Sequence, residues 1–429
     1  MKTLAVSFFL TAAVNAVAQT EVIVWYDSTQ TAVKERYYIL NGDSSMIDGL
    51  YLKYHENGGE AVKGYFNKGV KTGEFTEYYP TGEVMRTLVF KDGLKNGPVT
   101  VYREDGTIIQ EAYFINDTLS QRLVTYFENG AIRSETIFKD GKPEGVVKEY
   151  YPDGGLKQEI AYRNGKPNGL TRTYYPNGAV HTEAMLEDGI LNGEFKTFYP
   201  NGKPETVSFN IAGTKNGSFK SYDEQGRLTL EGGYVDGKPD GIYKGYYEDG
   251  SIKHIYRYSK GFRSGESVDY YPGGQVHKKT IYSSDEKNIE TAVYYQNGNV
   301  KEKTFHLNGH PAKTWQYFHE NGQLKLVESY EAGKLMGMRK TYDSLGALIL
   351  EEPYEYGAII GAVKEYYPSG QLKSETAYKL GKKHGPYKQY YESGTIEWDG
   401  YYGGGRPAGE WKRYDAEGNI IETLDYRKK

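Results

Sequence analysis

Cysteine is absent from the 429-residue sequence, and neither sign of charge dominates it. Without cysteine the chain has no disulfide framework, thiolate metal site or thiol nucleophile. Its 53 Lys and Arg residues against 57 Asp and Glu residues give a formal net charge of −4, so nothing attracts it generally to nucleic acid. By contrast, 53 Gly and 44 Tyr residues favour strands and tight turns. The composition therefore predicts an all-β protein.

Long hydrophobic runs are also missing, apart from a short one at the N-terminus. Residues 4–14 are mostly apolar, follow Lys2 and precede the small residues Ala16-Val17-Ala18. This pattern predicts a secretory signal peptide at residues 1–18. A membrane anchor is the alternative, but eleven residues reach only about half of a ~30 Å hydrocarbon core. We therefore expect an exported protein without a membrane span, located in the periplasm, at the cell envelope or outside the cell.

A glycine recurs every 24 residues along most of the chain, and we number positions within each repeat from this glycine. Sixteen repeats follow one another without insertion or deletion, which indicates that every connection is structurally constrained. The glycines are Gly58, Gly82, Gly106, Gly130, Gly154, Gly178, Gly202, Gly226, Gly250, Gly274, Gly298, Gly322, Gly346, Gly370, Gly394 and Gly418.

Position −4 of every repeat is aromatic. These residues are Tyr54, Tyr78, Tyr102, Tyr126, Tyr150, Tyr174, Phe198, Tyr222, Tyr246, Tyr270, Tyr294, Phe318, Tyr342, Tyr366, Tyr390 and Tyr414. Position +2 is Val, Ile or Leu in 14 of the 16 repeats, and position +8 is aromatic in 13. We expect these three columns to form the core.

Each repeat contains two turn signals. The first is written P-N-G or E-D-G, as in Pro176-Asn177-Gly178, and is typical of a three-residue hairpin loop with a left-handed glycine. In such a loop the residue at −4 faces the residue at +2. The second signal follows eleven residues after the first glycine, as at Gly93 and Gly165. Two strands and two turns per repeat predict a β-hairpin repeat.

The stretch YYPSGQLKSETAYKLGKKHG, from Tyr366 to Gly385, resembles the bacterial variant of the MORN repeat, and Gly409-Glu410-Trp411 resembles the start of a strand in that repeat. The resemblance covers residues 49–429. Similar arrays are often named antitoxin-like, but an antitoxin would meet its toxin in the cytoplasm, which the predicted signal peptide argues against.

We therefore predict an elongated single-sheet solenoid of about 16 antiparallel hairpin repeats at residues 49–429. Residues 19–48 contain strand-like segments out of register with the 24-residue repeat, and we interpret them as an N-terminal cap. Three irregular second turns, at 117–121, 285–289 and 309–313, lack one or both of the usual glycines and are either bends, contact sites or neutral changes.

No convergent catalytic chemistry stands out, so we expect a protein that is not an enzyme, with no catalytic residue, metal or cofactor. The eight histidines are scattered over different columns. Seven glutamates recur at +5, namely Glu111, Glu135, Glu159, Glu183, Glu231, Glu351 and Glu375. Such equivalent carboxylates do not provide the two environments that acid–base catalysis needs, and we expect them to pair with Lys on the facing strand.

A binding function fits the sequence better. Half of the repeats have an aromatic residue at −7, which simple alternation assigns to the face opposite position −4, unless a bulge reverses it. An open row would offer a ligand-contact surface, for which the candidates are Trp315, Tyr387, Tyr391, Trp398 and Trp411. The prediction is a scaffold that binds a protein partner; the alternatives are a cell-wall glycan-binding module, or rings that only reinforce the terminal repeats.

Overall fold

The computed structural model describes residues 18–428, so that the predicted signal peptide lies outside the described residues except for Ala18. In this range the chain forms 40 β-strands and one short 3-10 helix. It divides into two compact units. The first extends to Lys203 and includes Ile211–Gly213, and the second contains Pro204–Asn210 and the chain from Thr214 onward. The predicted all-β class is confirmed.

The first unit contains β1 (Gln19–Trp25), β2 (Val33–Leu40), β3 (Ile47–Tyr54), β4 (Glu60–Asn67), β5 (Val70–Tyr78), β6 (Val84–Lys91), β7 (Leu94–Tyr102), β8 (Ile108–Ile115), β9 (Thr118–Tyr126), β10 (Ile132–Lys139), β11 (Lys142–Pro143), β12 (Gly145–Tyr150), β13 (Leu156–Arg163), β14 (Lys166–Tyr174), β15 (Val180–Glu187) and β16 (Ile190–Phe198).

The second unit contains most of β17 (Pro204–Ile211), followed by β18 (Thr214–Tyr222), β19 (Leu228–Val235), β20 (Lys238–Pro239), β21 (Gly241–Tyr246), β22 (Ile252–Ser259), β23 (Phe262–Arg263), β24 (Gly265–Tyr270), β25 (Val276–Tyr282), β26 (Asn288–Tyr294), β27 (Val300–Leu307), β28 (His310–Pro311), β29 (Lys313–Phe318), β30 (Leu324–Glu331), β31 (Lys334–Leu335), β32 (Gly337–Tyr342), β33 (Leu348–Glu355), β34 (Ala358–Ile359), β35 (Gly361–Tyr366), β36 (Leu372–Lys379), β37 (Lys382–Tyr390), β38 (Ile396–Gly403), β39 (Arg406–Tyr414), β40 (Ile420–Asp425) and the helix η1 (Tyr426–Lys428).

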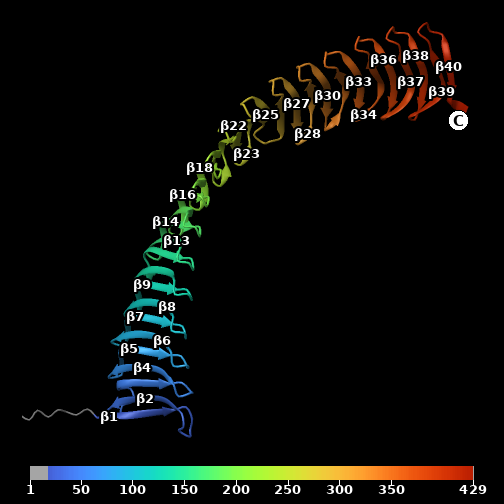
Figure 1. Cartoon of the computed structure of the whole chain (residues 1–429). Coiled ribbons are helices and arrows are strands. Elements are labelled where there is room, and N and C mark those ends of the chain that lie inside the picture. The colour runs from blue at the N-terminus through green and yellow to red at the C-terminus, as the bar shows by residue number, and fades with distance from the viewer. Residues whose placement is uncertain (1–17, 429) are drawn as a thin grey trace, which may run out of the picture. The chain divides into compact units, whose positions relative to one another are not determined.

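Within each unit the strands lie side by side in chain order and form an open antiparallel sheet (Figure 1). The first turn of each repeat has the predicted form. Tyr174 lies opposite Val180, and the amide of Gly178 donates a 2.9 Å hydrogen bond to the carbonyl of Tyr175. Gly178 has a φ of 83°, which a residue with a side chain adopts only at a cost. The hairpin repeat is confirmed.

The second turn is a two-residue loop in which both residues have positive φ, as in a type I′ turn. Asp188 and Gly189 have φ values of 50° and 86° and join Glu187 to Ile190, which lie opposite each other. The mirror-image turn matches the right-handed twist of the two strands it connects. This tight loop explains why the 24-residue spacing tolerates no insertion.

A bulge follows each regular second turn and is centred on the glycine at −9. Gly193 has a φ of 122°, and the strand register shifts between Ala184 and Leu186. Gln121 and Lys313 replace this glycine yet keep the same backbone, with φ values of 56° and 59°. In the irregular turn at 285–289, by contrast, β25 and β26 pair without a register shift. This hairpin has therefore lost the bulge.

Hydrogen bonds from one first turn to the next join consecutive hairpins. At −3 a tyrosine hydroxyl donates to the backbone carbonyl at −4 of the next repeat, as from Tyr151 to Tyr174 at 2.8 Å. The same bond is made by Tyr79, Tyr175, Tyr247, Tyr271, Tyr295, Tyr367 and Tyr391. Asn177 at −1 donates to the carbonyl of Pro200 at 2.8 Å. The sequence analysis missed both ladders.

The predicted single core of three columns is wrong, because the columns lie on opposite faces of the sheet. Position +8 shares one face with position −7, as Phe90 and Phe75 do with ring centroids 5.0 Å apart. We call this the aromatic face. Position −4 shares the other face with +5 and −6, because the hydroxyl of Tyr174 donates to Glu159 at 2.7 Å. We call this the charged face. The bulges change the simple alternation on which the prediction rested.

Candidate functional site

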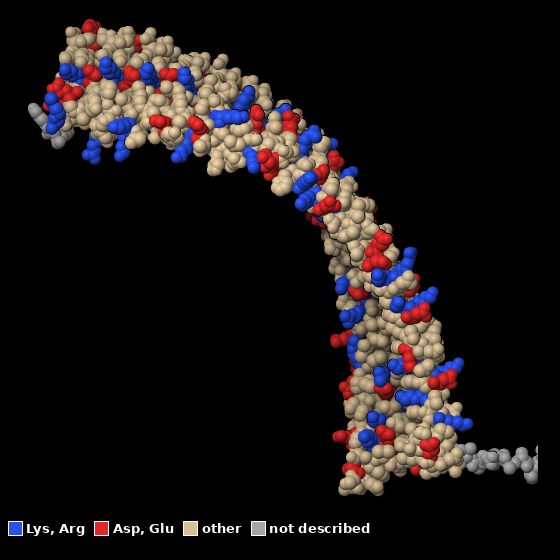
Figure 2. All heavy atoms as spheres, turned by 180° about the vertical axis from the view of Figure 1, so that it is seen from behind, with Lys and Arg blue, Asp and Glu red and all other residues tan. Residues whose placement is uncertain are grey.

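The charged face carries the paired charges that the sequence predicts. In the second unit, consecutive strands place Lys340, Glu351, Lys364, Glu375, Lys388, Asp399 and Lys412 opposite one another in turn. Figure 2 shows Lys and Arg alternating with Asp and Glu along one row of this unit. The ammonium of Lys340 lies 3.0 Å from the carboxylate of Glu351. These pairs are partly exposed, so each adds little to stability, and together they keep the face neutral.

Several of the +5 glutamates also accept a hydrogen bond from the −4 tyrosine of the next repeat. The hydroxyl of Tyr246 donates to Glu231 at 2.7 Å, and those of Tyr126, Tyr150, Tyr174 and Tyr366 bond likewise. Burial, together with the bond to Glu231, raises the pKa of Tyr246 to about 12. The same hydrogen bond lowers the pKa of Glu231. In these five repeats the −4 tyrosine is therefore held by a charge-assisted bond as well as by packing.

The aromatic residues at −7 do not form an open row. Phe75, Tyr243 and Trp411 are only 3%, 6% and 7% exposed, and they pack against the rings at +8. A glycine at +6 of the preceding repeat provides the space: a Cβ on Gly232 would lie 2.5 Å from the ring of Tyr243. Gly64 and Gly400 do the same beneath Phe75 and Trp411. The combination of glycine at +6 and an aromatic residue at −7 of the next repeat is a pattern that the sequence analysis missed.

An ion triad replaces the rings at one place on the aromatic face. Arg339 occupies −7, and its guanidinium lies 3.4 Å from Glu328 and 3.5 Å from Glu352, both at +6. The side chains of both glutamates are largely buried, and Tyr330 donates to Glu328 at 3.0 Å. Two carboxylates around one arginine leave a net negative charge under partial burial. Ion pairs therefore take the place of aromatic packing at this position, and we assign the triad a structural role.

Three of the five predicted ligand-contact residues come together near the C-terminal end of the second unit. The ring of Trp411 lies 5.2 Å from Tyr387, 5.0 Å from Tyr402 and 6.3 Å from Trp398. Tyr426 closes the group at 6.3 Å from Trp411. We call these five residues the terminal aromatic cluster. Trp411 is its buried centre, whereas Trp398 is half-buried.

A shallow hollow of about 220 Å³ opens onto the terminal aromatic cluster, with Gln389 and Leu424 completing its lining. The hydroxyl of Tyr387 donates to Gln389 at 2.7 Å, and the amide of Gln389 donates to Glu397 at 2.8 Å. Arg413 lies 3.9 Å from Glu397. Burial raises the pKa of Tyr387 to about 12, so the phenol is neutral at physiological pH. The hollow thus offers ring faces beside an amide, a carboxylate and a guanidinium.

The other two predicted residues lie apart from this hollow. Trp315 belongs to β29, where its indole donates to the carbonyl of Phe305 at 3.0 Å and its ring lies 4.8 Å from Tyr330. Tyr391 is a −3 residue whose hydroxyl donates to the carbonyl of Tyr414 at 2.9 Å. Both have structural partners, and a contact of either with a ligand stays a prediction.

Metal binding has no supporting cluster of side chains in the part of the chain that the structure describes. No group of three or more His, Asp or Glu side chains there could hold a metal ion. Burial lowers the pKa of His254, whose ring stacks on Tyr256 at 4.2 Å, so this histidine is a packing residue.

Within residues 18–428, no helix has the length and apolar character needed to cross a membrane.

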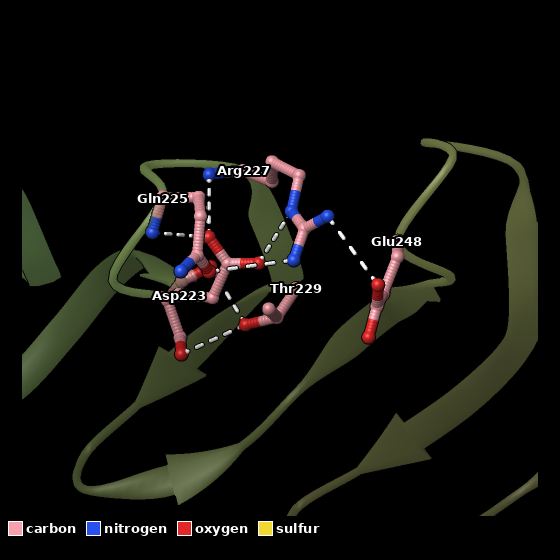
Figure 3. A network of polar contacts seen from close by, with 6 residues as sticks. Asp223, Gln225, Arg227, Thr229 and Glu248 are labelled. Carbon is pink, nitrogen blue, oxygen red and sulfur yellow. Dashed lines mark hydrogen bonds and ion pairs between the residues drawn. The ribbon is translucent and has the colours of Figure 1, made fainter.

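Three first turns, at Asp223, Asp343 and Asp415, use a different set of contacts, and Figure 3 shows the first of them. Asp223 replaces the usual tyrosine at −3, and its carboxylate accepts hydrogen bonds from the amides of Gln225 and Arg227 at 3.0 and 2.9 Å. The guanidinium of Arg227 donates to Asp223 at 2.7 Å and also reaches Glu248 at 3.4 Å. Aspartate therefore closes its own turn, whereas tyrosine at −3 bonds to the next one. We assign the network a structural role.

Comparisons with known proteins agree with the repeat. The sequence profile described as the MORN repeat variant matches eight segments, at residues 71–92, 143–164, 191–209, 239–260, 313–332, 360–380, 383–402 and 408–428. No protein of curated function matches the chain.

Solved structures that match include the crystal structure of TcdB2-TccC3-TEV, at 12% identity over 98% of this chain and 25% of that one, with a TM-score of 0.16. Another is the Tc holotoxin pore of Photorhabdus luminescens, at 14% identity over 93% of this chain and 19% of that one, with a TM-score of 0.14. The chain thus spans about a quarter or less of the length of these two proteins.

Proposed function

The chain is a MORN-variant repeat protein, and from this premise we propose that it is a non-catalytic scaffold that binds a protein partner at the cell envelope or outside the cell. Arrays of this kind offer a long surface that grows by one similar increment per repeat. The signal-peptide pattern at residues 1–18 supports export. The partner is a protein, and neither nucleic acid nor a cofactor is involved.

The observation that carries the proposal is the regular exposure of large apolar side chains on the charged face of both units. Leu170 and Ile242, both at −8, are among them, one in each unit. Such rows of exposed apolar groups mark interaction surfaces, because isolated soluble domains expose few of them together. Among the described residues of the two units, no group of three or more His, Asp or Glu side chains could hold a metal ion.

The proposal is tested by site-specific photo-crosslinking in intact cells of the source organism. A photoreactive residue at Leu170 or Ile242 should yield one defined protein adduct, whereas the same residue at Gly250, on a turn tip, should yield none. Absence of any protein adduct from both units would contradict the scaffold. Turnover of an envelope substrate that is lost on mutation of a single repeat would contradict the absence of catalysis.

A second candidate function, glycan binding, is favoured by the hollow over the terminal aromatic cluster. Ring faces of Trp398 and Tyr426 beside the amide of Gln389 offer the stacking and hydrogen bonds that sugar rings use. Purified peptidoglycan and a glycan array provide the test. Saturable binding that is lost in Trp398→Ala and kept in Trp315→Ala supports it. Trp411→Ala is unsuitable, because Trp411 is buried and its loss would destabilise the repeat.

A further inference from the structure

An apolar stripe crosses strands β10, β12, β13, β14 and β15 on the charged face of the first unit. It consists of Ile137 on β10, Val146 on β12, Ala161 on β13, Leu170 on β14 and Met185 on β15. Val146 lies opposite Ala161, and Leu170 lies opposite Met185. Ile137, Leu170 and Met185 are 48%, 39% and 42% exposed. We call this set the apolar stripe.

The bulge explains why these side chains remain uncovered. A Cβ on Gly193 would lie 3.1 Å from the Cβ of Met185, and one on Gly169 would lie 3.2 Å from that of Ala161. Glycine at −9 therefore leaves the neighbouring +7 side chain without a partner on one side. The bulge of the repeat therefore leaves the +7 position uncovered, and in this part of the chain apolar side chains occupy that position.

Four cations flank the stripe on the side of the second turns. Lys139 lies opposite Lys142, and Arg163 lies opposite Lys166. By alternation they share the charged face with Ile137 and Ala161, which precede two of them by two residues. Like charges directly opposite each other are unfavourable in a sheet. We call these four residues the cationic rim.

Little within the chain neutralises the cationic rim. Lys166 lies 3.7 Å from Asp188, but both side chains are 63% exposed, so this pair is weak. The other three cations form no ion pair with a residue in the range 18–428. On its other side the stripe adjoins carboxylates that are already bonded, since Glu135 accepts from Arg122 and Tyr150, and Glu183 accepts from Arg172. On the second-turn side the row is therefore positive at these four positions and ends at Glu187, which accepts a hydrogen bond from Asn192.

We propose that the apolar stripe and the cationic rim bind an acidic amphipathic helix of the protein partner. Strands lie about 4.8 Å apart, so the five side chains span about 19 Å in a single row. A helix across the strands advances about 5.4 Å per turn and presents one apolar position per turn, so about 14 residues match the row. Acidic residues along one flank of the helix would meet the cationic rim. The inference rests on the proposed function and names the partner's chemistry.

The test uses the full chain and a labelled 14-residue helical peptide with leucine along one face and glutamate along one flank, followed by fluorescence anisotropy. Saturable binding is expected at physiological salt. Leu170→Ser with Met185→Ser should weaken it roughly tenfold or more, because two partly buried apolar contacts are lost. Leu345→Ser is the control, because Leu345 is 86% exposed on a first turn of the second unit and lies outside the apolar stripe.

Charge variants complete the design. Lys142→Glu with Lys166→Glu should weaken binding severalfold and reduce its dependence on salt, whereas Lys238→Glu should not change it. Equal binding of a peptide with lysine in place of glutamate overturns the proposal, as does binding that ignores the Leu170 and Met185 changes. Binding to phosphatidylglycerol vesicles or to RNA, but not to the peptide, also overturns it. If peptide binding fails while crosslinked partners persist in cells, this inference fails and the scaffold survives.

Discussion

At the scale of single residues, the hydroxyl of the −4 tyrosine adds a hydrogen bond to the packing of its ring, and its contribution can be measured at Tyr246. Tyr246→Phe removes the 2.7 Å bond to Glu231 but keeps the ring. We expect the free energy of unfolding at neutral pH to fall by about 1–2 kcal/mol, because hydrogen bonds to charged groups are the strong ones. Denaturant unfolding measures the change.

The control for this change is Tyr294→Phe, since position +5 of the preceding repeat is Lys279 and provides no acceptor. Its expected cost is below about 0.5 kcal/mol. The Tyr246 effect should also depend on pH. Glu231 has a lowered pKa in the folded state, so its bond stabilises fully above the unfolded value near ~4.3 and is lost as pH falls through the folded value. A cost that persists undiminished in strong acid would contradict this explanation.

Two adjacent glycines provide a second test at this scale. Gly232→Ala would place a Cβ 2.5 Å from the ring of Tyr243, which is buried, so we expect a loss of about 1–3 kcal/mol. At Gly233 the nearest atom to an added Cβ is 3.4 Å away, an ordinary contact. Gly233→Ala should therefore be neutral or stabilise by up to about 1 kcal/mol. Thermal unfolding of both variants decides the matter, and equal melting temperatures would refute the space-filling role of position +6.

From the sequence we could predict which repeat positions are structurally important, but not which side chains they contact in the fold. The invariant aromatic residue at −4 and the turn glycine could be found because the physics of a hairpin loop restricts both positions. The partner of Tyr246 could not be found, because a hydroxyl and a carboxylate 15 residues apart meet only once the strand spacing is known. A glycine at +6 of one repeat followed by an aromatic residue at −7 of the next, as in Gly232 and Tyr243, is visible in the sequence. We missed this pattern because we considered only the alternation of residues along each strand.

At the scale of the hairpin, the left-handed residue at −9 defines the bulge, and Gln121 shows what it costs. Gln121 has a φ of 56° where most repeats have glycine. Gln121→Gly should stabilise the protein by about 0.5–1 kcal/mol, because the strain of a side chain in this conformation exceeds the added freedom of the unfolded chain. Ile289→Gly should do the opposite, since Ile289 pairs regularly with Tyr282. Denaturant midpoints of the two variants should therefore move in opposite directions.

The same bulges explain where prediction at this scale failed. Turn positions, strand number per repeat and the facing of Tyr174 and Val180 follow from local turn chemistry and were predicted correctly. Which face a column occupies depends on counting residues across the strand, and one extra residue reverses the answer. Position +8 was therefore grouped with −4, although Phe90 packs on Phe75 on the other face. The ligand-contact role of Trp398 stays a prediction.

At the scale of the whole molecule, each hairpin contacts only its neighbours in the chain, so damage should remain local. Phe75→Ala removes a ring that is 3% exposed and packs on Phe66 and Phe90. We expect faster hydrogen exchange in β4 to β7 and no change in β36 to β40, because no shared core transmits the loss. Exchange measured by mass spectrometry shows the distribution. Uniformly faster exchange along the chain would indicate one cooperative core.

Alkaline pH acts on the whole molecule at once, because the −4 tyrosines recur in both units. Burial, reinforced by the glutamate bond, raises the pKa of Tyr126, Tyr246 and Tyr366 to about 12 in the folded state. The unfolded value is about 10. A raised folded pKa means that the stabilisation is complete below pH ~10 and is lost as pH rises through about 12, since the unfolded chain releases its protons first. Circular dichroism against pH should therefore show unfolding together with tyrosinate formation. Tyrosines that ionise near their ordinary pKa while the strands persist would contradict the buried, bonded columns.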